Sequence, residues 1–247
     1  MYEEFSSVYD RLMSDVDYDL WSEYICSLLK ENGVPFGAAV YECCCGTGEL
    51  TKRLVKCGYK ITASDLSEDM LMIAREKCRR AGTMIPFVKA DMREITVHRP
   101  IDAVIACCDG VNYLTAEGDA EAFFKAAWTS LKPGGILLFD ISSEYKLSKI
   151  LGMNTFGEDE GDIAYIWKNM YDDTSKLVEL DLTFFVREGT AYKKFKERQV
   201  QRAFAVEELE TALAASGFDK IKAFGFGTDE APGSESERIQ FFARKKA

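Results

Sequence analysis

The stretch from Val40 to Leu50 constrains the fold of this chain more than any other. An apolar run ends at the acidic Glu42, a Gly46-Thr47-Gly48 turn follows, and a helical pattern begins directly after it. α/β proteins use such a strand–turn–helix unit to bring backbone close to a nucleotide-like ligand at the carboxyl end of a strand. The stretch therefore predicts an α/β fold with a ligand site at one edge of a parallel sheet.

Strand-like and helical segments alternate through the first 141 residues, starting with a helical segment at residues 2–13. Such alternation predicts a parallel sheet with right-handed crossovers and helices on both faces. The expected strands cover residues 38–42, 59–64, 85–89, 101–106 and 136–140.

The pattern changes after residue 141. Three long segments look extended and are joined by short turns, which fits antiparallel hairpins: 162–171, 176–187 and 190–204. A helical segment at 209–216 and two closing strands, at 218–225 and 237–245, follow. The sequence thus predicts an antiparallel β insertion before the sheet is completed.

Charge and hydropathy exclude several classes of partner. The chain has 31 Lys and Arg against 41 Asp and Glu, a net charge of −10, whereas duplex binding requires clustered basic residues. No apolar run approaches the roughly 18 residues of a membrane span, and the acidic N-terminus lacks the features of a signal peptide. We expect a cytoplasmic protein with a small-molecule substrate and neither DNA nor a membrane as partner; a monomer and a homodimer both remain open.

The eight cysteines do not have the spacing of a metal site. No Cys-x-x-Cys pair occurs, and His98 is the only histidine, whereas structural zinc sites use spaced Cys and His ligands. We expect no metal, and free thiols that pack as small apolar side chains.

Acidic residues at the ends of three expected strands indicate which ligand the turn holds. Glu42 ends the first strand, Asp65 ends the second, and Asp91 follows the third, next to Met92. A carboxylate at Asp65 can accept hydrogen bonds from both hydroxyls of a ribose. Asp91 can accept one from an adenine amino group, with Met92 as an apolar wall.

A nicotinamide dinucleotide fits this pattern less well. Its fingerprint requires Gly or Ala at the position of Thr51 and glycine at the position of Cys44. A nicotinamide-dependent oxidoreductase is therefore the weaker alternative. A non-catalytic cofactor-binding module or assembly partner is the other.

Four segments of the chain resemble the class I S-adenosylmethionine-dependent methyltransferases: residues 41–48, 64–71, 89–93 and 131–137. The chain is also similar to small bacterial methyltransferases that carry Phe5-Ser6-Ser7-Val8-Tyr9-Asp10 before the core and an antiparallel insertion after strand five. The resemblance implies a Rossmann-like three-layer, doubly wound sheet of seven strands, with the last strand antiparallel. It also implies transfer of a methyl group from S-adenosyl-L-methionine to a small molecule by in-line displacement, with S-adenosyl-L-homocysteine as product.

The resemblance implies a division of the chain into two parts. Residues 1–141 and 206–247 are expected to form the Rossmann-like domain that binds S-adenosylmethionine. Residues 142–205 are expected to form the antiparallel insertion, which would act as a substrate lid.

The resemblance also assigns the cofactor positions. Glu42 would lie near the methionyl amino group, Asp65 would hold the ribose, and Asp91 with Met92 would read the adenine edge. The full set of expected cofactor residues is Tyr9, Glu42, Cys43, Gly46, Gly48, Asp65, Leu66, Met70, Asp91, Met92 and Cys107.

The acceptor is expected near two segments. The loop after strand four faces the transferable methyl in the family, and it lacks the Asn/Asp-Pro-Pro-aromatic signature of adenine N-methyltransferases. Candidates for positioning an acceptor, or for catalysis if a proton must leave, are Tyr9, Asp109, Asn112 and Tyr113.

Within the insertion, Tyr165 and Trp167 alternate on one strand face. Arg198 and Arg202 belong to a basic stretch, which forms either one wall of a pocket for an anionic substrate or a solvated edge strand. We expect these four residues to contact the substrate. Relatives often carry a histidine just before Gln201, where this chain has Gln199.

Overall fold

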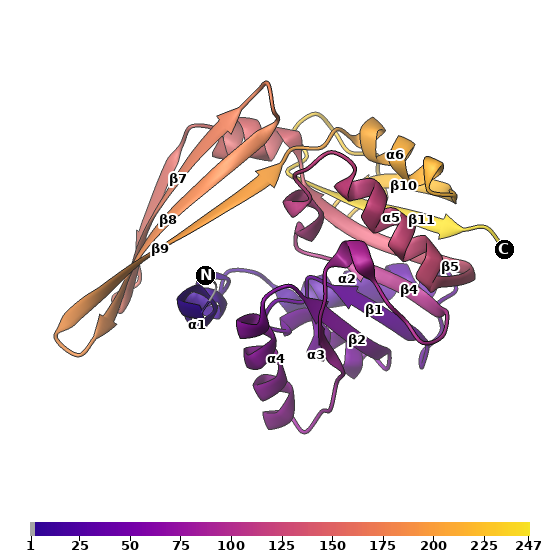
Figure 1. Ribbon diagram of the computed structural model, residues 1–247, viewed down its shortest axis with the longest axis horizontal. Coiled ribbons are helices and arrows are strands. Elements are labelled where there is room, and N and C mark those ends of the chain that lie inside the picture. Colours follow the sequence, from indigo (N-terminus) through magenta and orange to yellow (C-terminus); the bar gives the residue numbers. More distant parts are fainter. Residues whose placement is uncertain (1–2) are drawn as a thin grey trace.

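The computed structural model describes residues 3–247, apart from the side chains of Glu3, Glu4 and Ser7. Seven strands form the main sheet in the order β10-β11-β5-β4-β1-β2-β3 (Figure 1). Their bounds are β1 Ala39–Cys43, β2 Lys60–Asp65, β3 Phe87–Lys89, β4 Ile101–Ala106, β5 Leu131–Ser142, β10 Phe218–Gly225 and β11 Arg238–Lys245.

The strand directions confirm the predicted topology. Strands β1 to β5 pair in parallel, and β11 runs antiparallel to both β5 and β10. The strand order reverses between β1 and β4, which lie side by side. Ligands of doubly wound sheets bind at the carboxyl ends of the strands that flank such a switch point.

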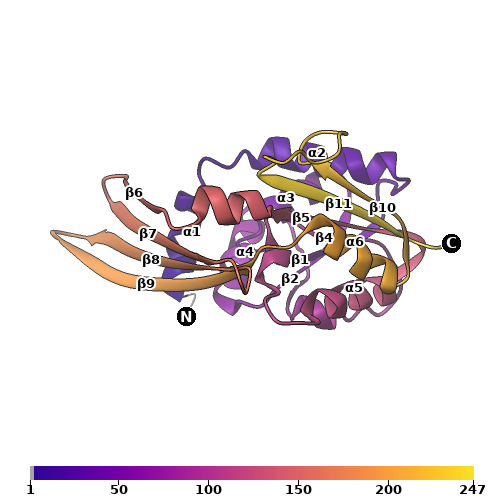
Figure 2. The same ribbon diagram turned by 90° about the horizontal axis from the view of Figure 1, so that it is seen from above.

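Helices cover both faces of the main sheet (Figure 2). On one face, α2 (Tyr18–Glu31), α3 (Glu49–Lys56) and α4 (Glu68–Arg80) pack against β1, β2 and β4. On the other, α5 (Asp119–Ser130) and α6 (Val206–Ala215) pack against β4, β5 and β11. Val104 and Ile105 of β4 are both fully buried, each in a different core, because a central parallel strand is covered on both faces.

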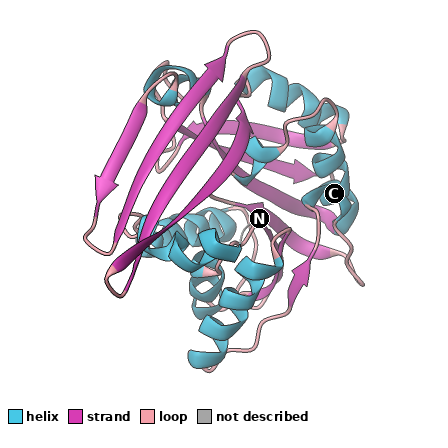
Figure 3. Cartoon of the chain, turned by 60° about the vertical axis from the view of Figure 1, so that its left-hand side comes forward, coloured by secondary structure: helices cyan, strands magenta, loops and turns pink. Residues whose placement is uncertain are grey.

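A second sheet extends from the carboxyl edge of the first (Figure 3). It consists of β6 (Thr155–Asp159), β7 (Ile163–Asp172), β8 (Leu177–Glu188) and β9 (Ala191–Arg202), all antiparallel. We call it the insertion sheet. A π-helix, Lys146–Leu151, connects it to β5. Helix α1 (Glu3–Leu12) packs between this sheet and α4 through Phe5, Val8 and Met70.

The structure departs from the predicted elements in two places. Strand β6 was not expected, because all five of its residues are exposed and show no apolar alternation. Strand β5 begins at Leu131 rather than 136, and so includes the Pro133-Gly134-Gly135 segment that reads as a helix breaker. No helix within residues 3–247 is long and apolar enough to cross a bilayer.

Candidate functional site

A small cavity lies at the switch point between the carboxyl ends of β1 and β4. It is lined by Tyr9 of α1, Tyr18 at the start of α2, the turn after β1, and Cys107 and Cys108 after β4. The structure thus brings together four of the predicted cofactor residues: Tyr9, Glu42, Gly46 and Cys107. The cavity measures about 30 Å³, which is room for little more than one water molecule.

The turn after β1 is built around two glycines and Asp65. Gly46 has a φ of 53°, and its N–H donates to Asp65 Oδ2 at 2.9 Å. Asp65 Oδ1 accepts from the Ser67 N–H at 2.9 Å. Gly48 has a φ of 78°, and a Cβ there would lie 3.1 Å from the Cβ of Ala74. The left-handed φ and the close approach to α4 both require glycine at Gly48.

Glu42 is a buried acid without a full set of partners. It is 2% exposed, and its Oε2 atom has no hydrogen-bond partner among the described residues. Burial raises the pKa of this carboxyl to about 8, and the charge of Asp65 adds to the effect. A buried oxygen of this kind is suited to accept a hydrogen bond from an ammonium group. The residue therefore fits the methionyl amino group that the sequence resemblance implies.

The adenine side of the expected site is arranged around Asp91. The Arg93 guanidinium donates to this carboxylate and, mainly through that bond, lowers its pKa. Met92 is buried and lies 3.6 Å, Sδ to Sγ, from Cys44. Leu66, directly after β2, is exposed, whereas Met70 is buried beneath α1.

Two tyrosines share the cavity. Burial raises the pKa of Tyr9 above its usual value, and nearby ionisable groups, first among them Tyr18, add to this. Burial also raises the pKa of Tyr18. Both phenols therefore stay protonated at neutral pH and serve as hydrogen-bonding groups rather than as bases. Tyr18 could not be recognised from the sequence, since a tyrosine at the start of an amphipathic helix gives no functional signal.

The eight cysteines are free thiols. Burial raises the pKa of Cys107 and of Cys108 well above the usual value, so neither thiol is a ready nucleophile. Among the described residues, no group of three or more His, Cys, Asp or Glu side chains is arranged to hold a metal ion.

The loop after β4 contains the predicted acceptor-positioning residues. Asp109 accepts from Gln201 Nε2 at 2.9 Å and from the Arg238 guanidinium at 2.8 Å. The Tyr113 hydroxyl donates to Gln199 Oε1 at 2.7 Å, and its ring is partly exposed. Both residues thus link the loop to β9.

Asn112, which the sequence places among the acceptor-positioning residues, is bonded to the backbone of neighbouring elements. Its side chain is fully buried; it donates to the carbonyls of Ser142 and Arg202 and accepts from the Ser142 N–H. These three bonds use most of the hydrogen-bonding capacity of the amide. Asn112 therefore anchors the loop to β5 and to the end of β9.

The insertion sheet separates the four predicted substrate residues. Tyr165 lies on the face that packs against α1, and Trp167, two residues along β7, shares that face. Arg198 and Arg202 lie on the opposite face, where they pair with Glu179 and Glu208. Both guanidinium groups are thus engaged in ion pairs on the face away from Tyr165, and their contact with a substrate stays a prediction.

The face that carries Tyr165 presents other polar residues of β9. Register pairs Trp167 with Leu182, and Leu182 with Glu197, so Glu197, Gln199 and Gln201 share this face. Glu197 and Gln201 are buried. Glu197 gives no functional signal in the sequence, because an acid within a basic stretch is typical of a solvated strand.

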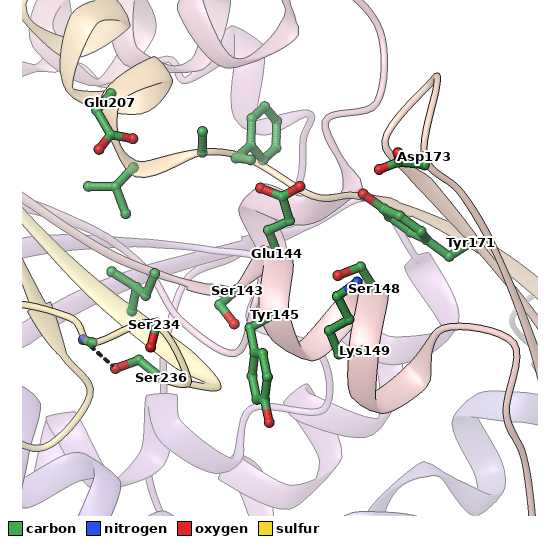
Figure 4. A pocket seen from close by; sticks show the side chains of 15 residues that line it. Ser143, Glu144, Tyr145, Ser148, Lys149, Tyr171, Asp173, Glu207, Ser234 and Ser236 are labelled. Carbon is green, nitrogen blue, oxygen red and sulfur yellow. Dashed lines mark hydrogen bonds between the residues drawn. The ribbon is translucent and has the colours of Figure 1, made fainter.

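A larger pocket opens where the insertion meets the main sheet (Figure 4). It has a volume of about 650 Å³, which is within the range of small-molecule sites. Its walls come from the π-helix, the end of β7, the connection from β9 to α6, and the loop before β11. Figure 4 shows its polar lining: Ser143, Glu144, Ser148, Lys149, Tyr171, Asp173, Glu207, Ser234 and Ser236.

Comparison with known proteins gives consistent matches. Residues 40–135 match a family model described as a methyltransferase domain. The chain is 40% identical over 246 residues to the putative methyltransferase YqeM of Bacillus subtilis (strain 168). The alignment covers 99% of this chain and 97% of the relative.

Solved structures match over the whole chain. A crystal structure of an S-adenosylmethionine-dependent methyltransferase from Clostridium acetobutylicum has a TM-score of 0.90 and 34% identity, covering 100% of this chain and 99% of that one. The sugar N-methyltransferase KedS8 from Streptoalloteichus has a TM-score of 0.78 and 20% identity, covering 98% and 92%. At 20% identity, the likeness to KedS8 shows a shared fold and no more.

Proposed function

The chain belongs to the class I S-adenosylmethionine-dependent methyltransferases, and on this basis we propose that it methylates a small-molecule acceptor by in-line displacement. The observation that supports this most is the cavity at the switch point, where Glu42, the Gly46 turn and the Cys107 loop converge. The bound cofactor supplies an electrophilic methyl group on a sulfonium. The protein must align the acceptor with that methyl and exclude water.

We assign the cofactor contacts from the geometry of the turn. Glu42 accepts hydrogen bonds from the methionyl ammonium, and Asp65 accepts them from the ribose hydroxyls. Gly46 and Gly48 allow backbone to approach, and Cys107 bounds the methionyl end. The adenine contacts remain those expected from the sequence: Leu66, Met70, Asp91 and Met92.

Side chains around the same cavity position the acceptor. Tyr9, protonated at neutral pH, donates or accepts a hydrogen bond without serving as a base. Asp109 and Tyr113 form the adjoining wall and connect it to β9. The insertion, residues 142–205, acts with α1 as the cover that excludes water.

The larger pocket is the proposed entry for the acceptor, which we propose to be an amine. Ser143 directly follows β5, the strand next to β4, so the pocket lies at the same edge of the sheet as Cys107. Its lining carries Glu144, Asp173, Glu207 and Lys149, and Lys176 pairs with both Glu144 and Asp173. Glu207 is the lining carboxylate that has no ion pair among the described residues, and it favours an ammonium-bearing molecule over an anionic one. The likeness in fold to a sugar N-methyltransferase agrees with this proposal.

The test is a screen of primary and secondary amines, matched with their hydroxyl analogues, for acceptor-dependent formation of S-adenosylhomocysteine. We expect turnover with amines only. Turnover confined to hydroxyl acceptors would support methyl transfer but refute the proposal that the acceptor is an amine. Binding of S-adenosylmethionine without turnover on any compound would support a non-catalytic binding module instead.

The pocket assignment has a separate test in two neighbouring acids. Glu207 lines the pocket, whereas Glu208 pairs with Arg202 outside it. We expect Glu207→Gln to raise the KM for the amine about tenfold, the loss of one charge-assisted contact, and Glu208→Gln to change it less than twofold. Equal effects of the two substitutions would refute the pocket as the acceptor site.

A further inference from the structure

The strand-four loop, residues 107–113, forms one wall of the cofactor cavity through Cys107 and Cys108. Its backbone adopts an uncommon conformation: Cys108 has a φ of 59° and Asp109 a φ of 53°. Two consecutive non-glycine residues in the left-handed region are disfavoured, and they persist only where surrounding structure holds them. The contacts that hold this pair therefore determine the shape of the cavity wall.

Asp140 supplies the first of these contacts. It lies near the end of β5 and is fully buried. Its two carboxylate oxygens accept the N–H groups of Cys108, at 2.8 Å, and of Asp109, at 3.0 Å. One buried carboxylate thus fixes both left-handed residues by their backbone.

Arg238, the first residue of β11, supplies the second. One guanidinium nitrogen donates to Asp140, and the other donates to Asp109 at 2.8 Å. The guanidinium also lies over the Trp21 ring, 4.9 Å from its centroid. A single planar cation therefore bridges the carboxylate that holds the loop backbone and the carboxylate that the loop carries.

The loop is also fixed against the turn that follows β1. A Cβ on Gly110 would lie 2.9 Å from the Cβ of Cys44, so the two backbones approach closely. Any movement of the strand-four loop changes its separation from the Gly46 turn, and with it the space at the methionyl end of the cavity.

We infer that Asp140 and Arg238 are positioning residues that hold the strand-four loop against the methionyl end of the cofactor. This inference rests on the proposed function. Neither residue lines the cavity itself; each acts through the backbone or side chain of the loop. The competing explanation is that the pair only stabilises the fold.

The experiment uses a charge-matched double variant, Asp140→Asn with Arg238→Gln. The cluster of Asp109, Asp140 and Arg238 has a formal charge of −1, and in the double variant Asp109 alone keeps that charge. Changes in affinity then report loop geometry rather than the field at the cavity. The control is Arg244→Gln on the same strand, whose guanidinium bonds the carbonyls of Gly134 and Asn32.

Two ligands distinguish positioning from general destabilisation. S-adenosylhomocysteine carries the amino-acid end, whereas methylthioadenosine shares the adenosine and thioether but lacks that end. Calorimetric titration of the full chain gives both dissociation constants. We expect the double variant to weaken S-adenosylhomocysteine binding about tenfold and methylthioadenosine binding less than twofold. The Arg244→Gln variant should leave the ratio of the two constants unchanged.

Other results would refute either the positioning role or the proposed function. Equal losses for both ligands, or an unchanged ratio in the double variant, would overturn the positioning role and leave the proposed function intact. Failure of the unsubstituted protein to bind S-adenosylhomocysteine would refute the proposed function itself. If the double variant does not fold, Arg238→Lys, which keeps the charge but cannot bridge both carboxylates, must shift the ratio in the same direction, by about threefold, or the inference fails.

Discussion

At the scale of single residues, Glu42 combines poor solvation with a role in binding. Its burial and raised pKa mean that the unliganded protein holds this carboxyl in its protonated form at neutral pH. An ammonium group placed beside it would stabilise the charged form. On the proposed assignment, Glu42 lowers the stability of the unliganded protein and raises its affinity for the cofactor.

The sign of the pH dependence follows from the raised pKa. The folded state holds the Glu42 proton more tightly than the unfolded state does. The resulting contribution to the free energy of unfolding is therefore complete below pH 4.5 and is lost as pH rises through about 8. Glu42→Gln removes the loss. We expect the free energy of unfolding of the variant, relative to that of wild type, to rise by roughly 2–4 kcal/mol between pH 5 and pH 8.5. Urea unfolding without ligand at the two pH values measures this difference.

The same substitution should weaken S-adenosylhomocysteine binding, since a neutral amide replaces the carboxylate. Titration calorimetry at pH 7.5 checks this part. A variant whose unfolding free energy tracks that of wild type at both pH values would show that Glu42 is not held in its protonated form.

Asp65 is the second residue on which the cofactor site depends. Replacement by alanine removes the acceptor for the ribose hydroxyls and for the Gly46 N–H. We expect Asp65→Ala to weaken S-adenosylhomocysteine binding by about 2 kcal/mol, as measured by calorimetry. Glu68→Ala is the matched control, because Glu68 is exposed and its ion pair is with Arg75, on the same helix. Unchanged affinity in Asp65→Ala would refute the ribose assignment.

At the scale of elements, α1 closes the cofactor cavity. Asp10 accepts from the Thr47 hydroxyl at 2.5 Å and pairs with Lys77 of α4, and Tyr9 lies near the Cα of Gly46. With these contacts in place the cavity measures about 30 Å³, so we expect the methionyl end of the ligand to enter when they open.

We therefore expect Asp10→Ala to raise the association rate of S-adenosylhomocysteine several-fold, because α1 opens more often. Stopped-flow tryptophan fluorescence measures the rate, and Asp15→Ala, an exposed change beyond α1, is the control. Equal association rates for all three proteins would mean that α1 does not limit entry.

The insertion sheet shows where sequence patterns stop being informative. Alternation along β7 places Tyr165 and Trp167 on one face, as predicted. Which face Arg198 occupies depends on the register between β8 and β9, set by the pairing of Glu188 with Ala191 at the turn. A shift of one residue would exchange the faces, and nothing in the sequence excluded that shift.

At the scale of the whole molecule, four residues that the sequence assigns to the cofactor line one cavity, whereas the residues that it assigns to the acceptor are spread over the strand-four loop and both faces of the insertion sheet. Glu42, Gly46 and Asp65 belong to short motifs at strand ends, where local pattern determines position. Asp140 and Arg238 act on a loop that is far from both in sequence. Such contacts arise only when the sheet brings β4, β5 and β11 together.

The two sheets also meet through a continuous set of hydrogen bonds. Gln199 and Gln201 bond the strand-four loop, and Asn112 bonds the carbonyl of Arg202. The base of the insertion is therefore attached to the same loop that bounds the cofactor cavity.

The most direct test of this account is the fate of a labelled methyl group. The protein is incubated with methyl-labelled S-adenosylmethionine and the amine panel, and the products are identified by mass spectrometry. We expect S-adenosylhomocysteine to form in step with a labelled amine, and both products to form more slowly in Asp65→Ala. Binding of S-adenosylmethionine with no acceptor-dependent release of S-adenosylhomocysteine would contradict it.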